Sequence, residues 1–196
     1  MAEKFKKILR WQIARNRIGK GKVRFTDKSQ VFSVKVSFIN EILRENDPYF
    51  VLVTRNPYAM CWRGAQTKGG MSHIRDDFSF EERLEWACQH WVNLNKYALE
   101  DGKQIDNFTT VRFEDVLKEP EKEIKELCNF TELEFSERMV PQPGDKLPFG
   151  CKYSHKWYPL RKDVNQKHFE KLTAKQADII EGYCGEYADK FGYEKP

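Results

Sequence analysis

An arginine at the end of an apolar run is the residue best suited to chemistry. Residues 49–54 are continuously apolar and β-branched, which is typical of a strand covered on both faces. Arg55 follows, and Asn56 and Pro57 have the residue types that cap and begin a helix. Such strand–helix junctions bind anions, and arginine donates paired hydrogen bonds to phosphate. The pattern predicts a phosphate site at Arg55 and Asn56. The alternative is an arginine paired with a surface acid.

The elements that must position this arginine alternate between strands and helices. Apolar runs predict strands over 30–36, 49–54 and 108–113, and residues 140–165 are expected to form a long irregular loop. Helical spacing predicts helices over 3–17, 36–45, 57–67, 79–102, 120–129 and 173–191. This order, with its long crossovers, favours a three-layer α/β fold with a mainly parallel sheet flanked by helices.

Composition limits the class of protein. The chain has 196 residues, of which 40% are hydrophobic and 33% charged. These values indicate a single globular domain and exclude fibrous or low-complexity classes. No apolar run approaches the roughly 20 residues of a membrane span, and no secretory signal is visible. We therefore expect a cytoplasmic protein without a membrane span.

The amino-terminal segment is strongly basic. Residues 1–24 carry nine lysines and arginines against one acid, Glu3, and contain Gly19 and Gly21. We divide the chain into a basic amphipathic helix with a Gly-containing linker, residues 1–24, and a single α/β domain, residues 25–196. One alternative function is anion binding, to nucleic acid or a membrane surface, through this basic segment.

The cysteines and histidines give no metal signature. The five cysteines form no C-x-x-C pair, which excludes a zinc ribbon and a thioredoxin-type site, and the histidines are not closely spaced. We expect free, mostly buried thiols and no metal. The cysteines are Cys61, Cys88, Cys128, Cys151 and Cys184.

Four segments, taken in order, resemble the sulfotransferase family. Residues 50–60 resemble that family's strand and Arg-Asp-Pro turn, which bind a 3′-phosphate. Residues 111–120 look like its Tyr-Glu-Asp-Leu segment, residues 26–30 resemble its Glu-Lys-Ser-Pro stretch, and residues 172–193 are similar to its carboxyl-terminal pattern. The resemblance implies a P-loop-like nucleotide-binding fold. It also implies transfer of a sulfuryl group from 3′-phosphoadenosine 5′-phosphosulfate to a hydroxyl of a carbohydrate or small molecule.

The resemblance assigns roles to several positions. Arg55 would contact the donor's 3′-phosphate, and Arg63 stands where the family has a second contact, a serine. Lys28 would lie near the transferred sulfuryl group and stabilise charge on the bridging oxygen. The alternative for Lys28 is an ordinary surface turn. Arg161 and Lys162 resemble an Arg-Lys-Gly loop that clamps the 3′-phosphate, with Asp163 in place of glycine.

The acceptor side is less defined. His73 and His155 lie in expected loops that could reach a substrate, and Trp157 belongs to an aromatic cluster that either lines an acceptor pocket or anchors a lid. The general base stays open between these histidines and a glutamate.

The family's phosphosulfate-binding strand, Gly-rich loop and helix have no match before Lys28, so the resembled fold is expected to be incomplete at its amino terminus. A second alternative follows, a non-catalytic or fragmentary family member that binds the nucleotide 3′-phosphate weakly or not at all.

Overall fold

The computed structural model describes residues 3, 7, 26–66, 78–142, 146–149, 156–159 and 161–196. Short 3-10 helices are labelled η. The elements are η1 (Gln30–Val34), α2 (Val36–Leu43), η2 (Arg44–Asn46), β1 (Phe50–Thr54), α3 (Pro57–Gln66), α4 (Phe80–Gly102), β2 (Phe108–Arg112), α5 (Phe113–Lys118), α6 (Pro120–Phe130), η3 (Glu137–Met139), β3 (Lys146–Phe149), β4 (Lys156–Pro159), α7 (Gln166–Phe169) and α8 (Ala174–Lys190).

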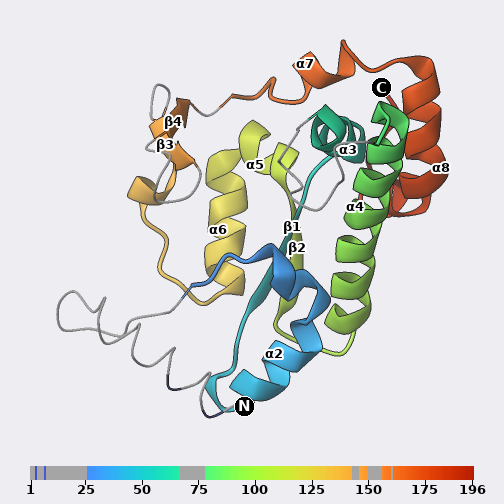
Figure 1. Cartoon of the computed structure of the whole chain (residues 1–196). Coiled ribbons are helices and arrows are strands. Elements are labelled where there is room, and N and C mark those ends of the chain that lie inside the picture. The colour runs from blue at the N-terminus through green and yellow to red at the C-terminus, as the bar shows by residue number, and fades with distance from the viewer. Residues whose placement is uncertain are drawn as a thin grey trace.

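A parallel pair of strands lies at the centre of the molecule. β1 pairs with β2 from Phe50↔Phe108 to Thr54↔Arg112, and α3 and α4 form the crossover between them. Helices α3, α4 and α8 lie on one side of the strands, and α5 and α6 on the other (Figure 1). The predicted α/β class, with a parallel sheet flanked by helices, is confirmed. The predicted domain division at residue 24 stays a prediction, since only residues 3 and 7 of the basic segment are described.

The two faces of β1 differ in burial, which corrects the prediction that both are covered. Leu52 and Thr54 point into the interior, where Leu52 packs with Val36 and Ala98. Val51 and Val53 on the other face are 37% and 59% exposed. Helix α5 contacts β2, and Val111 of β2 is buried.

The main core joins the three helices α3, α4 and α8. Its fully buried side chains include Tyr58, Leu84 and Ile180. α4 and α8 each begin with a capping box, formed by Ser79 with Glu82 and by Thr173 with Gln176, as the sequence predicts. No helix in the described part of the chain is long and apolar enough to cross a membrane.

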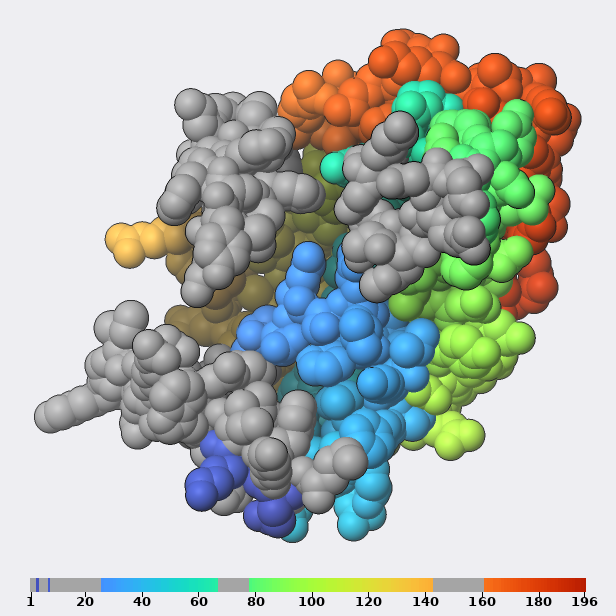
Figure 2. Space-filling view, in the orientation of Figure 1, coloured from blue at the N-terminus to red at the C-terminus, as the bar shows by residue number. Residues whose placement is uncertain are grey.

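The segment before β1 corrects one predicted strand. Residues 30–36 form η1 and the start of α2, because the backbone groups bond locally: Phe32 N donates to Ser29 O and Lys35 N to Phe32 O. The segment lies across the front of the molecule beside α4 (Figure 2). The predicted helix at 36–45 is confirmed as α2 and η2.

Two parts of the segment expected to be an irregular loop form strands. β3 and β4 form an antiparallel pair, with Lys146 opposite Pro159, and α7 follows. These strands contain prolines and lack alternation of apolar and polar residues, so the sequence pattern does not predict them. The structure also adds α5 directly after β2, whereas the sequence predicts a helix only from residue 120.

Candidate anion-binding site

Parallel pairing brings two sequence-distant residues to one edge of the sheet. Arg55 follows β1 and Glu114 lies just after β2, and these strands end side by side at Thr54 and Arg112. The Trp91 indole N–H donates to the Arg55 carbonyl at 3.0 Å, which fixes the turn against α4. The edge at the carboxyl ends of the strands is where α/β sheets bind ligands.

The Arg55 side chain is oriented by an asparagine from the far end of the chain. Its Nε and Nη2 donate to Asn165 Oδ1 at 2.8 and 2.6 Å, and its guanidinium lies 5.2 Å from the Phe113 ring centroid. A guanidinium has five N–H donors, and these contacts with the described residues use two of them along one edge. Asn165 therefore orients the guanidinium without contacting the edge that carries Nη1.

Glu114 joins three parts of the site. Its Oε1 accepts hydrogen bonds from Asn165 Nδ2 at 2.6 Å and from the Asn56 backbone N–H at 3.0 Å. Its Oε2 accepts from the Tyr193 hydroxyl at 3.0 Å. Burial, followed by the negative charge of Glu114, raises the pKa of Tyr193, so this phenol stays a proton donor. The carboxylate therefore holds the turn after β1, the residue before α7 and the chain end in one arrangement.

Asn56 builds the start of α3. Its side-chain oxygen accepts hydrogen bonds from Tyr58 N at 2.9 Å and Ala59 N at 3.4 Å, which is the N-cap role that its residue type predicts. Only 8% of Asn56 is exposed. Its predicted contact with a phosphate stays a prediction.

Two further cationic or titratable groups lie near Arg55. Arg63, in the last turn of α3, and Arg55 act on each other and on His168 electrostatically. Burial, and then the positive charges of Lys167, Arg55 and Arg63, lower the pKa of His168 to about 4. The His168 ring packs 5.6 Å from that of Trp62. Burial also lowers the pKa of Arg55. Cations crowded together in this way favour an anion.

The segment with Arg161 and Lys162 leads into Asn165 and α7, which packs against α3. Arg161 Nε lies 3.8 Å from Asp163 Oδ1, so the aspartate that replaces the family's glycine is paired. Lys162 Nζ donates to the Lys118 carbonyl at 3.5 Å. Asn165 thus ties this segment to Arg55, while the phosphate contacts of Arg161 and Lys162 stay predictions.

The remaining predicted residues cannot be placed against Arg55. Lys28 is exposed in an irregular stretch before η1. His73 and His155 lie outside the described residues, as does the Trp157 side chain, although its backbone belongs to β4. Their roles stay predictions.

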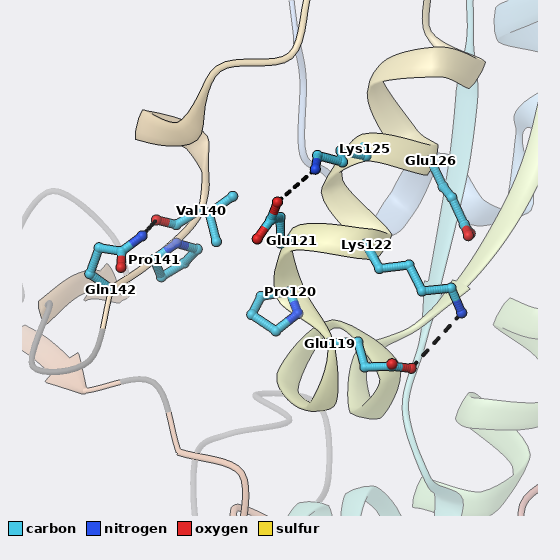
Figure 3. A pocket seen from close by; sticks show the side chains of 9 residues that line it. All are labelled: Glu119, Pro120, Glu121, Lys122, Lys125, Glu126, Val140, Pro141 and Gln142. Atoms are coloured by element: carbon cyan, nitrogen blue, oxygen red, sulfur yellow. Dashed lines mark hydrogen bonds and ion pairs between the residues drawn. The ribbon is translucent and has the colours of Figure 1, made fainter.

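A groove lies elsewhere among the described residues, between the first turns of α6 and residues 140–142 (Figure 3). Its lysines are neutralised by neighbouring carboxylates: Lys125 Nζ lies 2.6 Å from Glu121 Oε1, and Lys122 Nζ lies 3.9 Å from Glu119 Oε2. The carboxylates that pair with these lysines make the groove a poorer candidate for binding an anion than the turn at Arg55.

Comparison with known proteins identifies the family. A family model described as the sulfotransferase family matches residues 2–137, which is more than half of the chain. The chain belongs to the sulfotransferase family. The matched range includes Arg55, Arg63 and Glu114, whereas Asn165 and His168 lie beyond it.

A solved structure supports the fold of this sulfotransferase-family chain. It is titled "Sulfotransferase Domain from the Curacin Biosynthetic Pathway" and matches with a TM-score of 0.60 and 18% identity. The match covers 87% of this chain and 62% of that one, so the chain spans less than two thirds of the solved domain. At this identity the likeness shows the fold. No curated protein sequence matches the chain.

The sequence did not predict the roles of three residues of the site. Glu114 does have a signal, since it follows a strand within a family-like segment, but its role as the acceptor for three donors depends on tertiary contacts. Asn165 and His168 lie in a stretch expected to be a loop or left unassigned, more than a hundred residues from Arg55. No local pattern marks them.

Proposed function

We propose that this chain binds the 3′-phosphate of 3′-phosphoadenosine 5′-phosphosulfate at Arg55, with Arg63 and His168 beside it. The observation that carries the proposal is the oriented guanidinium at the carboxyl end of β1, whose contacts with Asn165 use one edge. The remaining edge matches the geometry of two phosphate oxygens. Membership of the sulfotransferase family supports this choice of donor.

Nearby charges favour the same ligand. Burial, and then the positive charges of Lys167, Arg55 and Arg63, lower the pKa of His168 to about 4. A phosphate dianion beside these cations would oppose their effect on His168. It would also favour a protonated His168, whose second N–H could then donate to phosphate. Asn165 and Glu114 act as positioning residues, because they hold the arginine without occupying its outer edge.

The proposed reaction is sulfuryl transfer to a hydroxyl of a carbohydrate or small molecule. The acceptor oxygen forms a bond to sulfur while the bond from sulfur to the bridging phosphate oxygen breaks, and the hydroxyl proton passes to a base. Lys28 is assigned to the charge that develops on the bridging oxygen. His73, His155 and Trp157 are assigned to the acceptor side. The base is one of these histidines or a glutamate.

Calorimetric titration with adenosine 3′,5′-bisphosphate, beside adenosine 5′-monophosphate, tests the binding step. We expect preference for the bisphosphate, and a loss of at least tenfold in its affinity in Arg55→Ala. Arg44→Ala is the matched control, since Arg44 is an exposed arginine paired with Glu41 and precedes β1, at the opposite end of that strand from Arg55. Equal affinity for the two nucleotides, or an unchanged preference in Arg55→Ala, would overturn the proposal.

One observation favours a second candidate, a non-catalytic family member. The residues before Lys28 contain no match to the family's Gly-rich phosphosulfate-binding loop. A transfer assay with sulfur-labelled donor and a panel of carbohydrate and phenolic hydroxyls separates the two candidates. Label transfer that Lys28→Ala reduces at least tenfold supports the enzyme. Nucleotide binding without transfer to any acceptor supports the non-catalytic candidate.

A further inference from the structure

Three cysteines meet inside the helical core. Cys61 of α3, Cys88 of α4 and Cys184 of α8 bring their sulfur atoms within 4.8 Å of one another. Exposure of these residues is 1%, 0% and 0%. They are separated along the sequence by 27 and 96 residues, so only the packing of the three helices gathers them. The sulfotransferase site described above uses none of them.

The arrangement has the size of a three-sulfur metal site. Metal–thiolate bonds are about 2.3 Å long, so three sulfurs around an ion in a plane lie about 4 Å apart. Sulfurs already within 4.8 Å of one another need only small shifts to reach that geometry. Among the described residues, no fourth cysteine, histidine or carboxylate joins the group. Nearby, Cys184 Sγ lies 3.9 Å from the Cys88 carbonyl oxygen.

Ligand type and coordination number select the ion. Thiolates favour soft ions such as copper(I) and zinc. Structural zinc takes four ligands in a tetrahedron, whereas the described cluster offers three. We propose that Cys61, Cys88 and Cys184 form a three-coordinate site for a soft monovalent cation of the copper(I) type.

Binding has a defined proton balance. Each of the three thiols that becomes a ligand releases its proton to solvent, because a metal ion binds the thiolate. Affinity should therefore rise with pH. The bound ion would tie together α3, α4 and α8, and so raise the free energy of unfolding. This site is independent of the proposed nucleotide binding.

Copper(I) titration of the reduced protein, under anaerobic conditions, tests the proposal. The ion is supplied as its acetonitrile complex against a chromogenic copper(I) chelator, both to folded protein and during refolding, because the cluster is fully buried. The double variant Cys128→Ala/Cys151→Ser retains only the three cluster thiols. We expect one tightly held ion per chain in the wild type and in this control, and at least a hundredfold weaker binding in Cys88→Ala.

Two further measurements distinguish loss of the metal site from misfolding of a variant. Unfolding of metal-free Cys88→Ala, monitored by circular dichroism, shows whether that variant folds. The variants Cys61→Ala and Cys184→Ala each remove a different ligand. X-ray absorption of the copper-loaded control should count three sulfur neighbours. The proposal is overturned if no ion is retained after refolding, if folded Cys88→Ala binds as tightly as the control, or if zinc competes on equal terms.

Discussion

Helix α3 serves two regions that are built in different ways. Its start belongs to a polar site, where Arg55, Asn56, Glu114 and Asn165 share directional hydrogen bonds. Its middle belongs to a core that excludes water, where Cys61 and its neighbours pack by shape. The polar region specifies orientation, and the core supplies stability. Changes in the core should therefore alter unfolding without altering ligand preference, and changes in the polar site should alter both.

Truncation in the core should give the largest loss of stability. Ile180 of α8 is 0% exposed, so Ile180→Ala leaves a cavity and should lower the free energy of unfolding by about 2–5 kcal/mol. Denaturant unfolding measures this loss. Val53→Ala is the control, since Val53 is 59% exposed, and should lose less than about 1 kcal/mol. A bisphosphate affinity that falls tenfold in folded Ile180→Ala would break the separation of the two regions.

Removal of the central acceptor should come next. Glu114→Ala leaves the Asn56 N–H, the Asn165 amide and the Tyr193 hydroxyl without their acceptor, and should lower the free energy of unfolding by about 2–4 kcal/mol. It should also weaken bisphosphate binding, because Asn165 no longer holds Arg55 in place. Glu114→Gln keeps one acceptor oxygen and should fall between the wild type and Glu114→Ala in chemical denaturation. Equal stability of all three proteins would contradict this role.

Acid should weaken the fold through His168. In the unfolded chain a histidine takes up a proton near pH 6.5, whereas burial and neighbouring cations hold the pKa of folded His168 at about 4. The unfolded state therefore binds more protons between these values, and this group's contribution to stability falls as the pH drops from about 6.5 to about 4. We expect a loss of about 1–3 kcal/mol over this window.

Denaturant unfolding at a series of pH values, with His168→Gln as the comparison, measures this contribution. The wild type should show the steeper decline below pH 6.5. The same slope in both proteins would mean that His168 does not carry the effect. With adenosine 3′,5′-bisphosphate bound, the decline should become shallower, because the phosphate favours protonated His168.

Removal of an exposed helix cap should give the smallest effect. The Ser79 hydroxyl accepts from Glu82 N at 3.2 Å and begins α4, so Ser79→Ala should lower the free energy of unfolding by about 1 kcal/mol. Ser136→Ala is the matched control, because Ser136 precedes η3 without a side-chain cap bond. Thermal unfolding compares the two variants. A Ser136→Ala loss as large as that of Ser79→Ala would contradict the capping argument.

Signals contained within a few consecutive residues predicted much of the fold. The apolar run of β1, the turn at Asn56 and Pro57, and the two capping boxes place α3, α4 and α8. Sequence patterns gave wrong predictions where tertiary contacts determine the local structure. Residues 30–36 alternate like a strand yet bond locally as η1, and the prolines of residues 146–159 conceal a strand pair.

The same limit applies to the sites. Arg55 could be predicted because strand, arginine and cap are contiguous. Asn165, which orients it, is 110 residues away and marked by no pattern. The three thiols are harder still: their wide spacing indicates ordinary buried cysteines, and only the packing of three helices brings their sulfurs together. Chemistry that depends on helix packing leaves little trace in local sequence.

A crystal structure of the chain with adenosine 3′,5′-bisphosphate tests the central claim most directly. The account predicts the 3′-phosphate on the Nη1 edge of Arg55, within hydrogen-bond distance, with Asn165 still accepting from Nε and with Arg63 and His168 beside the phosphate. A nucleotide bound elsewhere, or an Arg55 that keeps its Asn165 contacts and makes none with the phosphate, would contradict it.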